Sequence, residues 1–188
     1  MARVAIAILL VVLFAAGCGQ PGHGAETDSE KGSDVEILNA ALGRELTVLA
    51  AYTQGMPRIG PRFALSARRL RAQEQEYVSA IAKAIRGVGG RATGTASEID
   101  TGELHNQKDV LTLAYELESA ALAADVEAAP RLFTEAPRTL AASLAAGHAQ
   151  HLVVLRRGLG TPLAEAFPKP FGTGEIPPPG GETPRRKE

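Results

Sequence analysis

Apolar residues recur every three to four positions along four segments of the chain, the spacing that places them on one face of an α-helix. The segments cover about residues 34–54, 61–88, 108–128 and 138–159, and stretches containing Gly and Pro separate them. Ser33 and Glu36 form a predicted capping box at the start of the first segment. The pattern predicts an all-α domain in which four helices pack as an antiparallel bundle over residues 34–160.

The second segment carries a carboxylate in the centre of its apolar stripe. At about 100° per residue, one side of this helix holds Phe63, Ala67, Leu70, Tyr77, Val78, Ile81 and Ile85. Glu74 lies among them, whereas Glu76 points to the opposite, solvated side. A carboxylate buried alone is costly, so Glu74 needs a metal, a cation, a proton or a hydrogen-bond partner from another helix.

Two other helices carry acids at or near their apolar faces. Glu45 is at the centre of the first face, which comprises Leu38, Ala41, Leu42, Val48, Leu49 and Tyr52. In the third segment the predicted inward residues are Val110, Leu113, Ala114, Leu117, Ala121 and Ala124. Glu118 lies on the side shared with Leu111 and Leu122, so it is a better candidate for an inward group than Glu116 on the polar flank.

The fourth segment adds two histidines to this set of inward polar residues. Its apolar face holds Leu140, Ala141, Leu144, Leu152, Leu155 and Leu159, and His148 and His151 fall in the middle of it. A single histidine on an apolar face is usually a core residue with its hydrogen bonds satisfied. Two histidines at positions i and i+3, opposite buried acids, favour a shared polar site.

Two segments outside the helices lack an apolar period. We expect residues 91–107 to form a surface connection across one end of the bundle, with His105 exposed. Residues 161–188 are rich in Pro, Gly and charged residues, so we expect a tail that does not pack independently.

The amino terminus has the pattern of a processing signal. Arg3 supplies a positive charge, and residues 4–14 form an apolar segment that is too short to span a bilayer comfortably. The following Ala15-Ala16-Gly17-Cys18 resembles the lipobox of bacterial lipoproteins. We therefore expect residues 1–17 to be a signal peptide, Cys18 to be lipidated and residues 18–33 to be a flexible tether. The alternatives are an ordinary secretory signal that ends in cysteine, and an uncleaved anchor.

Charge and cysteine content narrow the expected partners. The formal net charge is −1, so the chain lacks the basic excess that attracts phosphate backbones, and nucleic acid is not an expected partner. Cys18 is the only cysteine, so no intrachain disulfide can form. Several acyl chains on Cys18, palmitate among them, would hold the protein stably at the outer face of a membrane in the cell envelope. The sequence identifies no protein partner and no oligomeric state.

The four predicted helices form an internal repeat. The first and third segments align without gaps, so that Glu45 matches Glu118 and Tyr52 matches Asp125 seven residues later. The second and fourth align in the same way and place Glu74 opposite His148 and Tyr77 opposite His151. The chain therefore consists of two helical hairpins of one design.

This plan resembles the ferritin-like superfamily, whose four-helix bundle carries one Glu on each of two helices and a Glu-x-x-His motif on each of the others. Within it, the likeness is to bacterial ferritin-like domain proteins related to desiccation-associated proteins. It covers residues 34 to about 170, including Asp34-Val35-Glu36-Ile37-Leu38, Asp109-Val110-Leu111, the Gly89-Gly90 stop and Ala166-Phe167-Pro168. The resemblance implies metal ligands at Glu45, Glu74, Glu118 and His151.

Two positions depart from the family pattern, and they limit what the resemblance implies. Tyr77 stands where a histidine belongs, and His148 stands where a bridging glutamate belongs. Two metal ions would therefore be under-ligated. One ion held by Glu74, Glu118, His148 and His151 would have a mixed nitrogen and oxygen set suited to iron, manganese or zinc. With no metal, protons on the two histidines could instead neutralise two of the glutamates.

Three functions from different classes follow from these observations. The preferred prediction is a cell-envelope lipoprotein with a degenerate di-metal site that binds at most one divalent ion. The alternative is a metal-free structural or interaction module of the envelope, which the two altered motifs support. A di-iron ferroxidase or iron store ranks lowest, because both motifs are altered and a lipid tether fits poorly with a closed storage shell. No catalytic residue is assigned.

Overall fold

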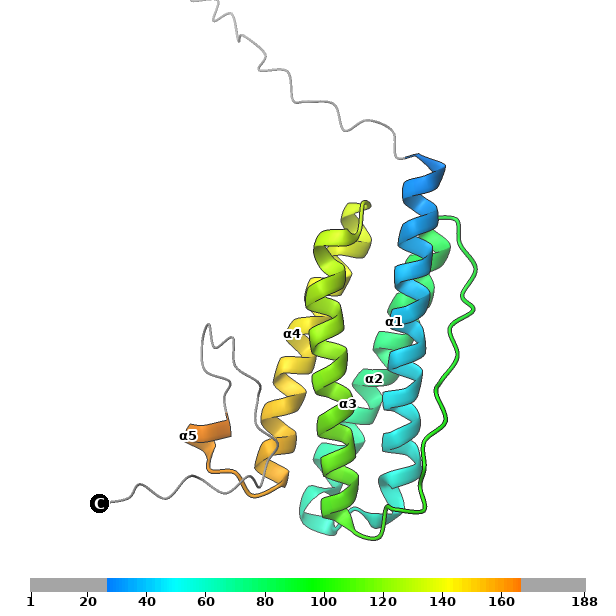
Figure 1. Ribbon diagram of the computed structural model, residues 1–188. Coiled ribbons are helices and arrows are strands. Elements are labelled where there is room, and N and C mark those ends of the chain that lie inside the picture. Colours follow the sequence, from blue (N-terminus) through cyan, green and yellow to red (C-terminus); the bar gives the residue numbers. More distant parts are fainter. Residues whose placement is uncertain (1–26, 167–188) are drawn as a thin grey trace, which may run out of the picture.

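Four long helices build the molecule. The computed structural model describes residues 27–166 of the chain. The helices are α1 (Asp28–Gly55), α2 (Pro61–Gly87), α3 (Gln107–Ala128) and α4 (Glu135–Gly158), and they pack side by side as an elongated bundle (Figure 1). The described residues contain no strand. The predicted all-α four-helix architecture is confirmed, whereas the predicted signal peptide, Cys18 and residues 167–188 lie outside the described residues.

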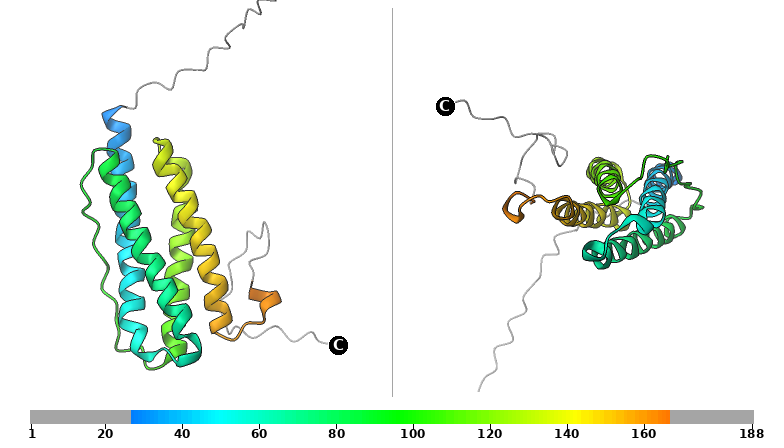
Figure 2. Two further views of the ribbon diagram at one scale, coloured as in Figure 1. Left: turned by 180° about the vertical axis from the view of Figure 1, so that it is seen from behind. Right: turned by 90° about the horizontal axis from the view of Figure 1, so that it is seen from below.

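A long crossover connects the two helical hairpins. Residues 88–106, between α2 and α3, run along the length of the bundle beside α1, from one end to the other (Figures 1 and 2). The prediction that this connection crosses one end of the bundle was therefore wrong, although His105 is exposed as expected. The crossover returns the chain to the end where α2 began. Consequently each packed pair of long helices, α1–α2, α3–α4, α1–α3 and α2–α4, is antiparallel.

Two side chains of α1 hold the crossover in place. The Asn39 side-chain oxygen accepts hydrogen bonds from the backbone N–H groups of Thr93 (2.6 Å) and Gly94 (3.0 Å). Two turns later along α1, the Thr47 hydroxyl accepts one from the N–H of Ser97 (2.8 Å). Gly43 lies between them, and a Cβ there would be 3.0 Å from the Thr95 carbonyl oxygen. The missing side chain at Gly43 lets the crossover lie directly against α1.

The first helix begins earlier than predicted. Thr27 caps α1: its hydroxyl accepts from the N–H of Glu30 (3.3 Å), and the Glu30 carboxylate accepts from the N–H of Thr27 (2.7 Å). This is a complete capping box, so the predicted cap at Ser33 was wrong and residues 28–33 are helical. The additional turns continue into Asp34, which is fully buried and accepts from the N–H groups of Phe133 (2.9 Å) and Thr134 (2.8 Å). Asp34 thus orders the turn before α4.

The ends of the other helices agree more closely with the pattern. α2 ends at Gly87, and Gly89 follows in the left-handed region (φ 86°), as the Gly89-Gly90 stop predicted. α4 begins at Glu135, three residues before the predicted start at Arg138. Part of the predicted tail is ordered, because α5 (Leu163–Ala166) follows α4 and Ala166 is buried. Short 3₁₀ helices, η1 (Met56–Arg58) and η2 (Ala129–Arg131), connect the helices within each hairpin.

The core consists of two apolar clusters. One includes Val48, Tyr52, Leu70, Leu111, Leu152 and Leu155, and the other includes Leu38, Leu42, Ile81, Ile85 and Leu144. Along α1, α2 and α4, residues of the two clusters flank a short polar stretch. Among the described helices, none combines the length and apolar character that crossing a bilayer requires.

The inward face of α3 is rotated relative to the prediction. Leu113, Leu117 and Ala124 were predicted to point inward but are only half-buried. Leu113 and Leu117 instead line a groove beneath the crossover. The buried residues are Val110, Leu111, Ala114, Tyr115, Glu118, Ala121, Asp125 and Ala128. Glu118 therefore lies at the centre of the inward face, not at its edge.

Candidate metal centre

The five predicted site residues meet in one buried layer of the bundle. α1 supplies Glu45, α2 supplies Glu74, α3 supplies Glu118, and α4 supplies His148 and His151. None of the five is more than 2% exposed. The packing of the apolar clusters on both sides fixes the four helices, and through them the positions of these side chains.

Four of these residues form a compact group, here called the His151 set: Glu74, Glu118, His148 and His151. Each offers one ligand atom, and these atoms all lie within 4.8 Å of one another. His148 Nδ1 is 2.7 Å from Glu118 Oε2, and His151 Nδ1 is 3.0 Å from Glu118 Oε1 and 3.0 Å from Glu74 Oε1. Two imidazole nitrogens and two carboxylates therefore converge from three helices.

The fifth residue, Glu45, belongs to a second group that shares His148. This Asp125 set consists of Glu45, Asp125 and His148, whose ligand atoms also lie within 4.8 Å of one another. His148 Nε2 is 3.1 Å from Glu45 Oε1 and 3.4 Å from Asp125 Oδ2. The two nitrogens of the His148 ring thus face different carboxylate groups, with the His151 set on the Nδ1 side and the Asp125 set on the Nε2 side.

Sequence reasoning missed Asp125, although a signal was present. Asp125 is fully buried, and it lies seven residues, or about two helical turns, after Glu118. That spacing places both residues on one face of α3. The repeat alignment matched Asp125 with Tyr52, which has the same relation to Glu45 on α1. The predicted face of α3 was centred too far from Glu118 for Asp125 to be recognised as inward.

Hydrogen bonds around the two sets hold the site residues in position. The Tyr52 hydroxyl donates to Glu118 Oε1 (2.8 Å), so Glu118 contacts donors from α1 and α4. His151 Nε2 is 3.2 Å from the side-chain oxygen of Gln73. His151 Nδ1 carries a single proton, and this proton points toward Glu118 and not toward Glu74. Neither oxygen of Glu74 therefore has a hydrogen-bond partner among the described residues.

Tyr77 packs against the two histidines of the site. Its ring stacks on His151 with centroids 5.6 Å apart and meets the edge of His148 at 5.5 Å. Its hydroxyl lies against Gly147, where a Cβ atom would collide with it. Burial and the nearby Glu74 charge raise the pKa of Tyr77, so the phenol stays neutral near pH 7. Tyr77 is thus a packing residue at the position where the resemblance placed a histidine.

The buried charges determine where protons reside. Burial alone would lower the pKa of His148, but contacts with the carboxylates of Asp125, Glu118 and Glu45 raise it to about 12. Burial opposes the charge on His151 as well, yet contacts with Glu118 and Glu74 raise its pKa to about 9. Both imidazoles are therefore protonated near pH 7 in the absence of metal.

The two glutamates of the His151 set shift in opposite directions. Burial raises the pKa of Glu118, but hydrogen bonds from His148 and His151 outweigh it and lower the value to about 2. Burial raises the pKa of Glu74 to about 8, and the opposing contact with His151 only partly offsets it. Near pH 7, Glu118 is thus a carboxylate between two imidazolium groups, and Glu74 holds a proton.

Comparison with known proteins places the chain in a family. A family model described as "Ferritin-like domain" matches residues 33–161. A solved structure described as a ferritin like, diiron-carboxylate protein from Bacillus anthracis str. Ames is similar with a TM-score of 0.59 and 16% identity. That match covers 70% of this chain and 98% of the other. No curated protein matches the chain. The chain therefore belongs to the ferritin-like domain family, as its four-helix bundle and buried Glu/His layer had indicated.

Proposed function

We propose that this protein binds one divalent metal ion in the His151 set, within a ferritin-like bundle held at the cell envelope through lipidated Cys18. The observation that carries the metal proposal is the convergence of four ligand atoms within 4.8 Å from fully buried residues. Two imidazole nitrogens and two carboxylates make a mixed donor set suited to iron, manganese or zinc. The envelope part rests on the sequence before Cys18.

The donor set fits one ion better than the two of a diiron-carboxylate protein. A glutamate can span two ions with its two oxygens, whereas a neutral imidazole has one lone pair and binds one ion. His148 stands at the position of the bridging glutamate. When its Nδ1 binds an ion in the His151 set, its Nε2 carries the proton and donates to Glu45, with Asp125 Oδ2 at 3.4 Å. Glu45 and Asp125 would then orient the His148 ring without binding the ion.

A bound divalent ion would supply positive charge in place of the protons that the layer holds without metal. His148, His151 and Glu74 all carry protons near pH 7, and they must release them before they can ligate an ion. Binding should therefore release protons and strengthen as the pH rises toward 9. Because the ligands come from three helices, binding should also stabilise the folded bundle.

The proposal is tested by titrating the metal-free protein with zinc or ferrous ions. We expect one equivalent per chain, loss of binding in His151→Ala, and unchanged binding in Tyr77→Phe. His105→Ala, at an exposed histidine of the crossover, is the matched control and should bind like wild type. Two equivalents of iron per chain, with rapid oxygen consumption after ferrous iron is added, would contradict the proposal and favour a ferroxidase.

A metal-free envelope module is the second candidate, and one observation favours it. All four ring nitrogens of His148 and His151 already have an oxygen partner at 2.7 to 3.2 Å. The layer can therefore be neutralised by protons alone. No bound metal after purification without chelator, together with no uptake on titration at pH 8, would favour this candidate over the single-ion site.

A further inference from the structure

Arg44 extends from the surface of α1 toward the buried layer. It precedes Glu45, and its Nη2 atom lies 3.6 Å from Oδ1 of Asp125 on α3. The Arg44 side chain is 31% exposed, whereas that of Asp125 is 1% exposed. The other oxygen of Asp125 is 3.4 Å from His148 Nε2. A guanidinium at the surface is thereby connected through one carboxylate to the ring that both ligand sets share.

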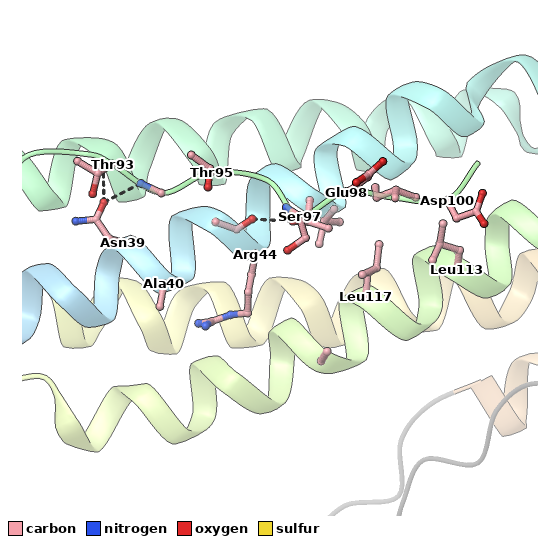
Figure 3. A pocket seen from close by; sticks show the side chains of 16 residues that line it. Asn39, Ala40, Arg44, Thr93, Thr95, Ser97, Glu98, Asp100, Leu113 and Leu117 are labelled. Atoms are coloured by element: carbon pink, nitrogen blue, oxygen red, sulfur yellow. Dashed lines mark hydrogen bonds between the residues drawn. The ribbon is translucent and has the colours of Figure 1, made fainter. Parts of the chain in front are cut away.

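Arg44 also separates the Asp125 set from the surface. It lines a groove of about 790 Å³ between α1, α3 and the crossover, and a second hollow of about 300 Å³ toward the start of α1. Figure 3 shows its side chain reaching from α1 toward α3, on the side of α1 away from the crossover. Glu45, Asp125 and His148 line neither hollow. The guanidinium therefore lies between these hollows and the buried carboxylates.

The Asp125 set has oxygen atoms that could bind an ion. Both oxygens of Asp125 and Oε2 of Glu45 are buried and have no hydrogen-bond partner among the described residues. Carboxylate oxygens without donors are ligands that hard ions such as Mn²⁺ accept. We propose that Arg44 takes the place of a second metal ion, and that its positive charge keeps the Asp125 set from binding one. This inference rests on the proposed single-ion site.

A count of charges in the layer supports this role for Arg44. When one divalent ion is bound, the ion and Arg44 together carry three positive charges. The four acids carry four negative charges, so one negative charge remains in excess; these acids are Glu45, Glu74, Glu118 and Asp125. A second ion would reverse the sign and would lie close to the guanidinium, whose repulsion is strong in a buried setting. Without Arg44, one ion leaves an excess of two negative charges, which a second divalent ion would cancel. Removing Arg44 should therefore open a second position at Glu45 and Asp125.

Manganese titration of the full chain tests this inference, with free Mn²⁺ counted by its electron paramagnetic resonance signal. We expect one bound equivalent in wild type and two in Arg44→Met. Arg44→Lys retains the positive charge and should bind one. The double variant Arg44→Met with Asp125→Asn should return to one, because the second position has lost a carboxylate. Arg62→Met, at an exposed arginine of α2, is the control and should behave like wild type.

The wild-type result separates failure of this inference from failure of the proposed function. No binding in wild type overturns the single-ion site, and two equivalents overturn both proposals. One equivalent in both wild type and Arg44→Met overturns the role of Arg44 alone. If Arg44→Met does not fold without metal, it should refold when Mn²⁺ is present, since the ion replaces the missing charge. Failure to refold with Mn²⁺ would also contradict the inference.

Discussion

Glu118 makes the largest number of hydrogen bonds in the buried layer. Its oxygens contact the Tyr52 hydroxyl, His151 Nδ1 and His148 Nδ1 at 2.7 to 3.0 Å. Glu74, by contrast, has no hydrogen-bond partner within residues 27–166 and holds a proton near pH 7. The two glutamates therefore differ in their surroundings: Glu118 neutralises the histidines, whereas Glu74 is a buried, protonated carboxyl that would become a ligand in the proposed site.

Replacing Glu118 should destabilise the metal-free protein strongly. Glu118→Leu leaves two buried imidazolium groups without their main partner, a kind of loss that costs about 3 to 5 kcal/mol. Glu116→Leu, at an exposed position two residues earlier, should change the free energy of unfolding by about 0.5 kcal/mol or less. Urea denaturation at pH 7 with chelator present measures both. Similar losses in the two variants would show that the inward face of α3 is assigned wrongly.

The metal-free protein should also lose stability as the pH rises. The pKa of His151 is raised from 6.5 to about 9, so its stabilising contribution is complete below pH 6.5 and is lost as the pH rises through 9. The pKa of Glu74, raised from 4.5 to about 8, adds a loss in the same direction. The pKa of Glu118, lowered to about 2, adds stability above pH 4.5 that disappears as the pH falls through 2.

Denaturation midpoints between pH 5 and 10, measured with chelator, test this prediction. They should be highest near pH 5, fall gradually up to pH 6.5 as Glu74 loses its contribution, and fall most steeply between pH 7 and 9. His151→Gln should reduce the fall on the alkaline side, because it removes one of the three groups responsible, the others being Glu74 and His148. Equal midpoints at pH 6 and pH 9 would be incompatible with these pKa shifts.

At the scale of the helices, the contact between α2 and α4 depends on a glycine. The Tyr77 hydroxyl occupies the space where a Cβ of residue 147 would lie. Gly147→Ala should therefore destabilise the protein by about 1 to 3 kcal/mol through overpacking, although alanine favours helix. Gly87→Ala, at a helical glycine with open space around it, should be neutral or stabilise by up to about 1 kcal/mol.

A second substitution separates the clash from other effects of Gly147→Ala. Tyr77→Phe removes the hydroxyl nearest to the added methyl group, so it should recover part of the stability lost by Gly147→Ala. The two changes should thus be non-additive in thermal denaturation, as expected for residues in contact. Strict additivity would show that Tyr77 does not limit the residue at position 147.

Much of each helix could be predicted from its apolar period, but the connections could not. The stripe from Phe63 to Ile85 predicted the buried face of α2, including Glu74. The start of α1 was missed because Ser33 and Glu36 have the spacing of a capping box, and Thr27 and Glu30 have the same spacing. The path of the crossover depends on Asn39, Gly43 and Thr47, whose roles are visible only when the connection lies against them.

The candidate site was predictable to the extent that it follows helical faces. Glu45, Glu74, His148 and His151 were each central to an apolar stripe, and all are buried. Asp125 was not identified because the predicted face of α3 was centred too far from Glu118, and Arg44 was not identified because its role comes from a contact with Asp125 on another helix. Asp34 was missed for the same reason, since its partners are backbone N–H groups about 100 residues away in the chain.

At the scale of the whole molecule, the proposed function requires both a buried metal site and a membrane anchor. Cys18 precedes the first described residue, Thr27, by nine positions, so the lipid would be connected to the bundle by a short segment. Cys18→Ser should release the protein from membranes into the soluble or culture fraction. Mass analysis of the amino-terminal peptide should show added acyl chains in wild type only. Membrane retention of Cys18→Ser without a lipid mass would indicate an uncleaved apolar helix.

The most direct test of the central claim is anomalous diffraction from crystals soaked with zinc at pH 8. We predict one peak per chain, about 2.0 to 2.2 Å from Nδ1 of His148, Nδ1 of His151 and carboxylate oxygens of Glu74 and Glu118. Glu45 and Asp125 should remain on the Nε2 side of His148, outside the coordination sphere. Two peaks about 3.5 to 4 Å apart within the bundle, or no peak among these residues, would contradict the account.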